Sequence, residues 1–283
     1  MNKKLDKYLS KRRNQGTVIL CFKILVDNVI ENGFDATMLK SEIHSKFDEQ
    51  HKDYGIGTFR SDYLLRQSAS NDLNAIGVRS DNKTFYINPE FIEGLSIKEL
   101  QRISTDITEH YNAIIGKQRA FFEEIKSYLE KGIEKRKQFI IEMLSNRETD
   151  KKGQSFEVTS FAILKTFYKI RGFSLNRFST VYSNDGGVDF ASQIAVYQVT
   201  TSLSPKKFEE DLAKAPLKQR VFVYKTATSA FDPKSFDDEL VLDHISLDDL
   251  IEHLEYLLKK KPEQNSTMII KEIISEFERE YYL

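Results

Sequence analysis

Residues 186–200 of this 283-residue chain read Gly-Gly-Val-Asp-Phe-Ala-Ser-Gln-Ile-Ala-Val-Tyr-Gln-Val-Thr, and this stretch decides the fold of the second half. The Gly186-Gly187 pair marks a turn, because glycine adopts backbone conformations that other residues avoid. Residues 188–191 and the strongly apolar run 194–200 then read as two short strands. We therefore expect two neighbouring strands here, with Asp189 close to the start of the first.

The segments around this stretch alternate between helix and strand. Helices are expected near residues 154–171, 205–215 and 247–260, and strands near 174–181, 220–226 and 241–245. Strands interleaved with helices indicate an α/β domain. The run Asp150-Lys151-Lys152-Gly153 is its clearest boundary, so this domain is predicted to cover residues 151–283.

The first 95 residues show a different pattern. The spacing of apolar residues predicts helices over 14–32, 36–47 and 58–68, followed by short strands over 74–78 and 84–88. Three helices and a β-hairpin in this order describe a winged helix-turn-helix. Cys21 lies in the apolar stripe of the first helix and is interpreted as a core residue.

Residues 96–150 contain no proline and keep helical spacing throughout. We expect long amphipathic helices that connect the two domains and provide a dimerisation surface. A helical lid of the second domain is an equally good interpretation.

Composition excludes several classes of protein. The single cysteine excludes a disulfide framework and a cysteine-rich zinc site, and the five scattered histidines lack metal-ligand spacing. No segment approaches the roughly 18–20 apolar residues of a membrane span, no nucleotide-binding glycine motif follows a strand, and the N-terminus does not resemble a signal peptide. We predict a cytoplasmic protein without a membrane partner.

Three polar residues of the second domain suggest a site for a divalent cation. Gln198 shares a strand face with Thr200, and its side-chain oxygen is expected to approach Asp189 across paired strands. Glu157, on the preceding helix, adds a second carboxylate. Oxygen donors of this kind suit Mg²⁺, which needs few protein ligands and keeps several waters. Each feature taken singly also has a structural interpretation, as an ordinary turn, a half-solvated strand and a first-turn helix residue.

At these residues the sequence resembles the PD-(D/E)XK nuclease superfamily, in particular its Mrr-like and type II restriction-endonuclease branch. The family pattern is a helical Glu, then Gly-Gly-(Val/Ile)-Asp, then an apolar strand ending in Gln-x-Lys or Glu-x-Lys. Glu157, the segment 186–189 and the segment 197–199 match it in order, and the resemblance covers about residues 154–258. It implies an α/β (α+β) fold with a restriction-endonuclease-like core, and Mg²⁺-dependent, site-specific cutting of double-stranded DNA in a phage-defence system. A cognate methyltransferase encoded nearby is the further partner that it implies.

The resemblance also implies roles for single residues. Asp189 would be the principal metal ligand, Gln198 a second ligand or its positioner, and Glu157 an additional carboxylate. The family lysine, however, is replaced by Thr200. One explanation is that a lysine on another element supplies the missing charge; the candidates are Lys165 and, after the strand, Lys206 or Lys207. The other is that the site tolerates threonine and relies more on the metal. The alternative is a catalytically inactive nuclease-fold protein that binds DNA as a regulator or assembles a defence complex. A nuclease for RNA or modified DNA is a third interpretation.

The winged helix is the predicted DNA-reading module. Arginine and amide side chains pair with base edges, while hydroxyls and basic residues hold phosphates. The candidates on the third helix are Thr58, Arg60, Ser61, Arg66 and Gln67, and those on the wing are Arg79 and Lys83. Winged helices also mediate protein contacts, so that interpretation stays open. We expect a homodimer, because palindromic sites match two-fold symmetry.

The charge balance limits how such a protein binds DNA. The chain carries 42 basic and 43 acidic residues, and the three predicted regions have net charges of +1, 0 and −2. No region is basic in bulk. Binding driven by bulk charge is therefore excluded as the main activity, and a DNA footprint depends on where single basic residues lie.

Overall fold

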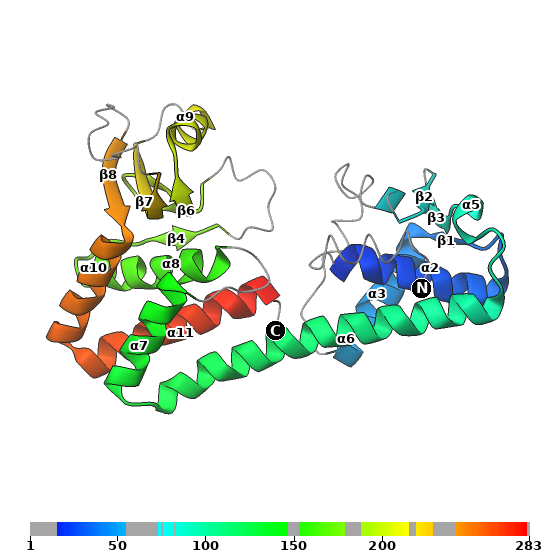
Figure 1. The fold of residues 1–283 in the computed structure, drawn as a ribbon, viewed down its shortest axis with the longest axis horizontal. Helices are drawn as coiled ribbons and strands as arrows, with labels where there is room; N and C mark the ends of the chain where they lie inside the picture. The colour runs from blue at the N-terminus through cyan, green and yellow to red at the C-terminus, as the bar shows by residue number, and fades with distance from the viewer. Residues whose placement is uncertain are drawn as a thin grey trace. The chain divides into compact units, whose positions relative to one another are not determined.

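The chain folds into a mixture of helices and two separate sheets (Figure 1). The computed structural model describes residues 16–54, 73–74, 76–81, 83–146, 153–178, 188–214, 219–228 and 241–281. Two compact units are present, Met1–Ala120 with Tyr281–Leu283, and Phe121–Glu280. Helix α6 (Ile97–Ser127) runs from the first unit into the second. The region 96–150, predicted as a separate connector, is thus divided between the two units.

The first unit combines helices with a three-stranded antiparallel sheet. The sheet order is β1-β3-β2. Its elements are α2 (Gly16–Asn32), β1 (Thr37–Leu39), α3 (Lys40–Tyr54), β2 (Val78–Ser80), β3 (Thr84–Ile87), α5 (Pro89–Ile92) and the first part of α6.

Two sequence predictions for this unit need correction. The second helix begins at Lys40 and not at residue 36, because Thr37–Leu39 form strand β1 against β3. Burial of Met38 in that pairing favours the strand over the helix start predicted from Asp35, since tertiary packing overrides a local capping signal. The strand predicted over 74–78 is β2 at Val78–Ser80. The third helix predicted over 58–68 lies outside the described residues.

The core of the first unit is built on α2. Nearly every described residue of its first three turns is buried, and Leu100, Ile103 and Ile107 of α6 pack in the same cluster. Cys21 is fully buried, and this burial raises the pKa of its thiol to about 12. Its prediction as a core residue is confirmed.

The second unit contains a five-stranded sheet of order β4-β5-β6-β7-β8. The pairs β4/β5 and β5/β6 are antiparallel, whereas β6/β7 and β7/β8 are parallel. Its elements, besides the end of α6, are η2 (Tyr128–Glu130), α7 (Ile133–Ser145), α8 (Gln154–Lys169), β4 (Asn176–Arg177), β5 (Phe190–Ala191), β6 (Val196–Leu203), α9 (Pro205–Lys214), β7 (Arg220–Ala227), β8 (Val241–Ser246), α10 (Leu247–Lys260) and α11 (Pro262–Tyr281).

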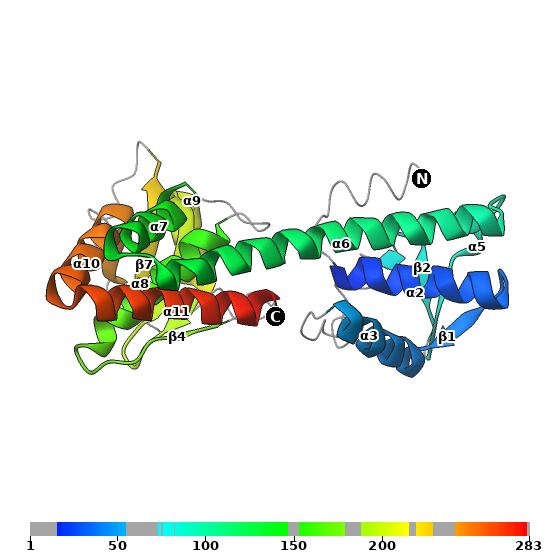
Figure 2. The same cartoon turned by 90° about the horizontal axis from the view of Figure 1, so that it is seen from below.

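The alternation of helix and strand predicted for residues 154–260 is confirmed, and so is a mixed fold class. The described part of the strand predicted over 174–181 is only Asn176–Arg177. Helix α11 was not predicted; it lies against α8, where Glu272 pairs with Lys165 (Figure 2). Among the described helices, none is long and apolar enough to cross a membrane.

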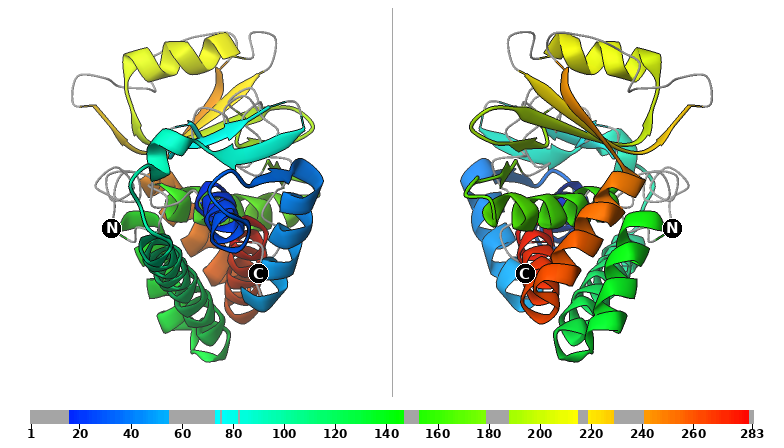
Figure 3. Two further views of the ribbon diagram at one scale, coloured as in Figure 1. Left: turned by 90° about the vertical axis from the view of Figure 1, so that its right-hand side faces the viewer. Right: turned by 90° about the vertical axis from the view of Figure 1, so that its left-hand side faces the viewer.

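Helices α8 and α9 cover opposite faces of this sheet (Figure 3). Phe161 of α8 contacts Phe190 of β5, with ring centroids 5.1 Å apart. On the other face, Phe208 of α9 contacts Phe222 of β7 at 4.6 Å. Because successive strand residues point to opposite faces, these contacts fix the direction of every neighbouring side chain. We call the two sides the α8 face and the α9 face.

Candidate active site

Asp189 and Gln198 form a cross-strand pair beside the start of β5. The Asp189 N–H donates to the Tyr197 carbonyl at 3.0 Å, which continues the β5/β6 ladder by one residue. The Gln198 Nε2 group donates to Asp189 Oδ2 at 3.1 Å, and the Val199 N–H donates to the same oxygen at 2.6 Å. The predicted proximity of Asp189 and Gln198 is confirmed, but the amide nitrogen of Gln198, and not its oxygen, approaches the carboxylate.

The amide orientation leaves the oxygen of Gln198 without a partner. An ionised carboxylate only accepts hydrogen bonds, so the NH₂ group of Gln198 must face Asp189. Gln198 is 5% exposed, and its Oε1 is buried with no hydrogen-bond donor. A buried acceptor left unsatisfied is unusual in a folded protein and marks a polar position on the α9 face.

Thr200 does not supply the function of the missing lysine. Its Oγ1 donates to the Ser202 carbonyl at 3.0 Å, further along β6. A hydroxyl engaged in this way carries no charge and only hydrogen-bonds locally.

Glu157 lies in a network on the α8 face. Its Oε1 accepts hydrogen bonds from Arg177 Nε at 2.9 Å and from Arg177 Nη2 at 2.7 Å. Arg177 Nη1 donates to Glu276 Oε2 of α11 at 2.8 Å. Arg177 is paired with Phe190, whose ring contacts α8. Asp189 immediately precedes Phe190 at the start of β5 and therefore points to the opposite face of the sheet. The structure therefore separates Glu157 from the Asp189–Gln198 pair, contrary to the predicted three-residue metal site.

The lysines considered as replacements all have acidic partners on helices. Lys165 Nζ contacts Glu272 Oε1 of α11 at 2.5 Å and lies over the Phe161 ring. Lys206 pairs with Glu210 at 3.7 Å, and Lys207 pairs with Asp211 at 2.9 Å. Lys165 thus serves the contact between α8 and α11, and its predicted catalytic role finds no geometric support.

Arg220 is a basic residue on the α9 face that was not predicted as part of the site. Arg220 begins β7 opposite Val196, two residues before Phe222, which lies opposite Gln198. Its side chain is fully buried, and burial lowers its pKa, against the opposing charges of Asp211 and then Asp189. A charged first residue in the apolar strand 220–224 was the available signal.

The chemistry of the donors at Asp189 and Gln198 is that of a Mg²⁺ ion with few protein ligands. Searching the described part of the chain for three or more clustered His, Cys, Asp or Glu residues gives no metal site. Mg²⁺ nevertheless binds through one or two carboxylates with several waters retained, and the unsatisfied Gln198 Oε1 is an oxygen donor of the right chemistry. Asp189 and Gln198 would hold the ion without Glu157.

The predicted DNA-contacting residues fall into two groups. Thr58, Arg60, Ser61, Arg66 and Gln67 lie outside the described residues. Arg79 Nη1 donates to the Asn74 carbonyl and to Asn74 Oδ1, each at 3.0 Å, so the side chain folds back onto its own hairpin.

At the tip of the wing, Lys83 is exposed and its N–H donates to Asp81 Oδ1 at 3.1 Å. Hydrogen bonds from Thr84 and Lys83 hold the pKa of Asp81 below its usual value. Asp81 Oδ1 therefore accepts hydrogen bonds from the start of β3, and Lys83, predicted as a wing residue, is exposed.

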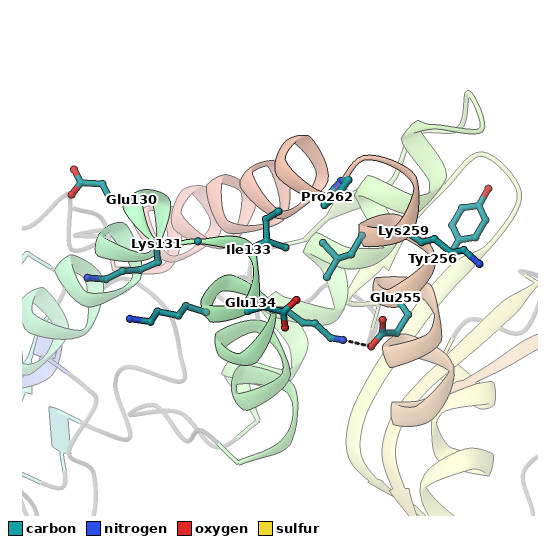
Figure 4. A pocket seen from close by; sticks show the side chains of 12 residues that line it. Glu130, Lys131, Ile133, Glu134, Glu255, Tyr256, Lys259 and Pro262 are labelled. Atoms are coloured by element: carbon teal, nitrogen blue, oxygen red, sulfur yellow. Dashed lines mark ion pairs between the residues drawn. The ribbon is translucent and has the colours of Figure 1, made fainter.

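A groove of about 990 Å³ lies away from the sheet, between α7, α10 and the start of α11 (Figure 4). Lysine and glutamate side chains of both signs line it, and Lys137 pairs with Glu255 across it at 2.5 Å. Neither Asp189 nor Gln198 contributes to its lining. Its mixed charge gives no preference for an anionic or a cationic ligand.

Comparisons with protein-family models, with curated proteins and with solved structures gave no match. A function for this chain is therefore inferred from its own residues.

Proposed function

We propose that this chain is a Mg²⁺-dependent endonuclease that cuts double-stranded DNA, with Asp189 and Gln198 at the centre of its active site. The observation that carries the proposal is the hydrogen-bonded pair that these residues form across β5 and β6. Helix α8, the Gly-Gly-Val-Asp sequence before β5 and the Gln-bearing strand β6 follow one another in the order of the PD-(D/E)XK pattern, which supports the resemblance.

The residues of the site have distinct tasks in this proposal. The Val199 N–H holds the Asp189 carboxylate in place, and Gln198 fixes it from the neighbouring strand. Asp189 and Gln198 provide the oxygen donors for the metal. When bound, Mg²⁺ activates a water molecule and stabilises negative charge on the phosphoryl group.

The first unit is the DNA-binding module of the proposal. The order α2, β1, α3, β2, β3 with an antiparallel three-stranded sheet supports a winged helix-turn-helix. Lys83 at the wing tip is the described residue that would contact phosphate. A homodimer on a palindromic site, a role in restriction and a cognate methyltransferase complete the proposal.

The test is cleavage of mixed-sequence plasmid DNA by the purified full-length chain. We expect discrete fragments with Mg²⁺, none with EDTA, and none with Asp189→Asn. Asp248→Asn is the matched control, because Asp248 is an exposed aspartate at the start of α10. Equal cutting by D189N and wild type would refute the assignment of the site.

A catalytically inactive DNA-binding regulator is the second candidate. Thr200 stands in place of the family lysine, and Glu157 and Lys165 are engaged in ion pairs with Arg177 and Glu272. A gel shift with duplex DNA and no cutting at any Mg²⁺ or Mn²⁺ concentration would favour this candidate over the nuclease.

A further inference from the structure

Arg220 is a fully buried arginine whose guanidinium has no hydrogen-bond partner among the residues that the structure describes. Its side chain is 0% exposed, and Nε, Nη1 and Nη2 all lack an acceptor. Buried arginines are nearly always paired, because an unsatisfied buried charge is costly. Arg177 and Arg136, two other buried arginines of the second unit, both follow this rule. The exception at Arg220 therefore calls for a functional reason.

The register of the sheet places Arg220 on the same face as the Asp189–Gln198 pair. Strands β6 and β7 are parallel, and their pairing is regular from Val196↔Arg220 to Thr200↔Tyr224. Side chains two residues apart share a face, so Arg220 points to the side of Gln198, and Asp189 lies opposite Gln198 on β5. The α9 face thus gathers one guanidinium, one amide and one carboxylate around adjacent strands.

Electrostatics links the same residues. Burial lowers the pKa of Arg220, while the charges of Asp211 on α9 and, to a smaller extent, of Asp189 raise it. An arginine keeps its proton under these conditions, because its pKa lies far above neutrality. Arg220 is therefore a fixed positive charge under the influence of two carboxylates.

We propose that Arg220 is a positioning residue that supplies the positive charge of the Asp189–Gln198 site, in place of the strand lysine that Thr200 replaces. Its charge offsets that of Asp189 and favours the negative charge that develops on a phosphoryl group during cleavage. Arg220 acts on the site through its electric field and not by direct contact, because the low-dielectric protein interior screens charges weakly. The consequence for cleavage rests on the proposed nuclease function, whereas the coupling of Arg220 to Asp189 does not.

The coupling is tested first by a double-mutant cycle on stability. Arg220→Met, Asp189→Asn and the double variant are unfolded in urea, with secondary structure followed by circular dichroism. We expect R220M to change the urea midpoint by a different amount in the D189N background than in wild type, because the Asp189 charge that Arg220 offsets is absent from D189N. If R220M changes it equally in both backgrounds, the proposal is overturned.

A parallel cycle with Asp211→Asn separates the proposal from a purely structural role. Asp211 is fully buried on α9 and exerts the larger effect on Arg220. Coupling to Asp211 alone, with none to Asp189, means that Arg220 only anchors α9 and contradicts the proposal. Should R220M fail to fold, Arg220→Gln replaces it in both cycles.

The second test measures cutting kinetics with Arg220→Lys as the conservative variant. We expect R220M to lower kcat on the order of 10- to 100-fold with little change in KM, and R220K to recover most of the loss. Arg136→Met is the matched control, because Arg136 is a buried arginine bonded to Glu263 and Thr267 at α11. Wild-type kcat in R220M, or equal loss in R220K and R220M, overturns the proposal.

The two tests distinguish a failure of the role proposed for Arg220 from a failure of the proposed nuclease function. Cutting by wild type with no Arg220–Asp189 coupling refutes the role of Arg220 and leaves the nuclease. Coupling without any cutting by wild type refutes the nuclease and leaves Arg220 as the charge partner of Asp189.

Discussion

The two faces of the five-stranded sheet each bury an arginine, and the two arginines differ in their hydrogen bonding. On the α8 face, Arg177 makes hydrogen bonds to Glu157 and Glu276, and its carbonyl accepts from Arg279 at 3.0 Å. On the α9 face, Arg220 has no hydrogen bond within the described part of the chain, and neither does Gln198 Oε1 on the same face.

This difference indicates that the two arginines have different roles, one in stability and the other in a functional site. A satisfied ion-pair network fixes how α8, β4 and α11 pack, because breaking it would leave charges buried without partners. Unsatisfied groups lower stability and are retained where a site needs them. By this criterion the paired Arg177 holds the domain together, and Arg220 and Gln198 mark the part of the α9 face where we expect binding or catalysis. Four experiments test the contrast.

The largest expected effect is on stability, from Arg177→Met. Removing this arginine leaves Glu276, 5% exposed, and Glu157, 14% exposed, without their main partner. We expect a loss of about 3–5 kcal/mol in the free energy of unfolding, measured by urea denaturation. R220M should lose less than half of that, because it breaks no hydrogen bond. Equal losses in the two variants would remove the contrast between the faces.

Glu157→Gln and Glu276→Gln form the next pair. Each replaces one carboxylate partner of Arg177 and should cost about 1–3 kcal/mol. Since both residues lie on the α8 face, we expect the two variants to match in stability and in cleavage rate. Loss of cleavage in E157Q alone would show that Glu157 serves the metal after all.

Thr200→Lys adds a positive charge to the α9 face, whereas Arg220→Met removes one. Thr200 Oγ1 makes only short-range bonds to Ser202, so the stability change should stay within about 0.5 kcal/mol. The new lysine brings a positive charge to the face of Gln198 and Arg220. We expect T200K to restore cleavage in the R220M background, measured as kcat on a plasmid. A double variant as slow as R220M would argue against charge as the missing factor.

Lys165→Met should have the smallest effect. The Lys165–Glu272 pair is 39% and 20% exposed, and partly exposed ion pairs contribute about 0–1 kcal/mol. Lys137→Met, which removes the comparable pair with Glu255, is the control. Similar unfolding midpoints and cleavage rates in the two variants are expected. A drop in cleavage confined to K165M would reinstate Lys165 as the migrated lysine.

Much of the second unit was predictable because its signals are local. Alternating apolar residues and turn residues gave β5, β6, β7, β8 and α10 to within a few residues. The Asp189–Gln198 pair followed from a short connection between neighbouring strands, which forces them to pair. Strand β1 was missed because Thr37–Leu39 become a strand only through β3, almost fifty residues later.

The sequence by itself determined which segments are helices and strands in the second unit, and that Asp189 and Gln198 meet. Only the tertiary structure decided which groups share a face of the sheet. Spacing along the chain does not show which face of the sheet a helix covers. For this reason Glu157 was predicted in one site with Asp189, and Arg220 was not predicted there. Glu157 pairs with Arg177, which is 20 residues further along the chain. Arg177 also pairs with Glu276, on the last helix of the unit. Pairing of buried charges depends on such distant contacts, because each charge must find a partner wherever the fold brings one.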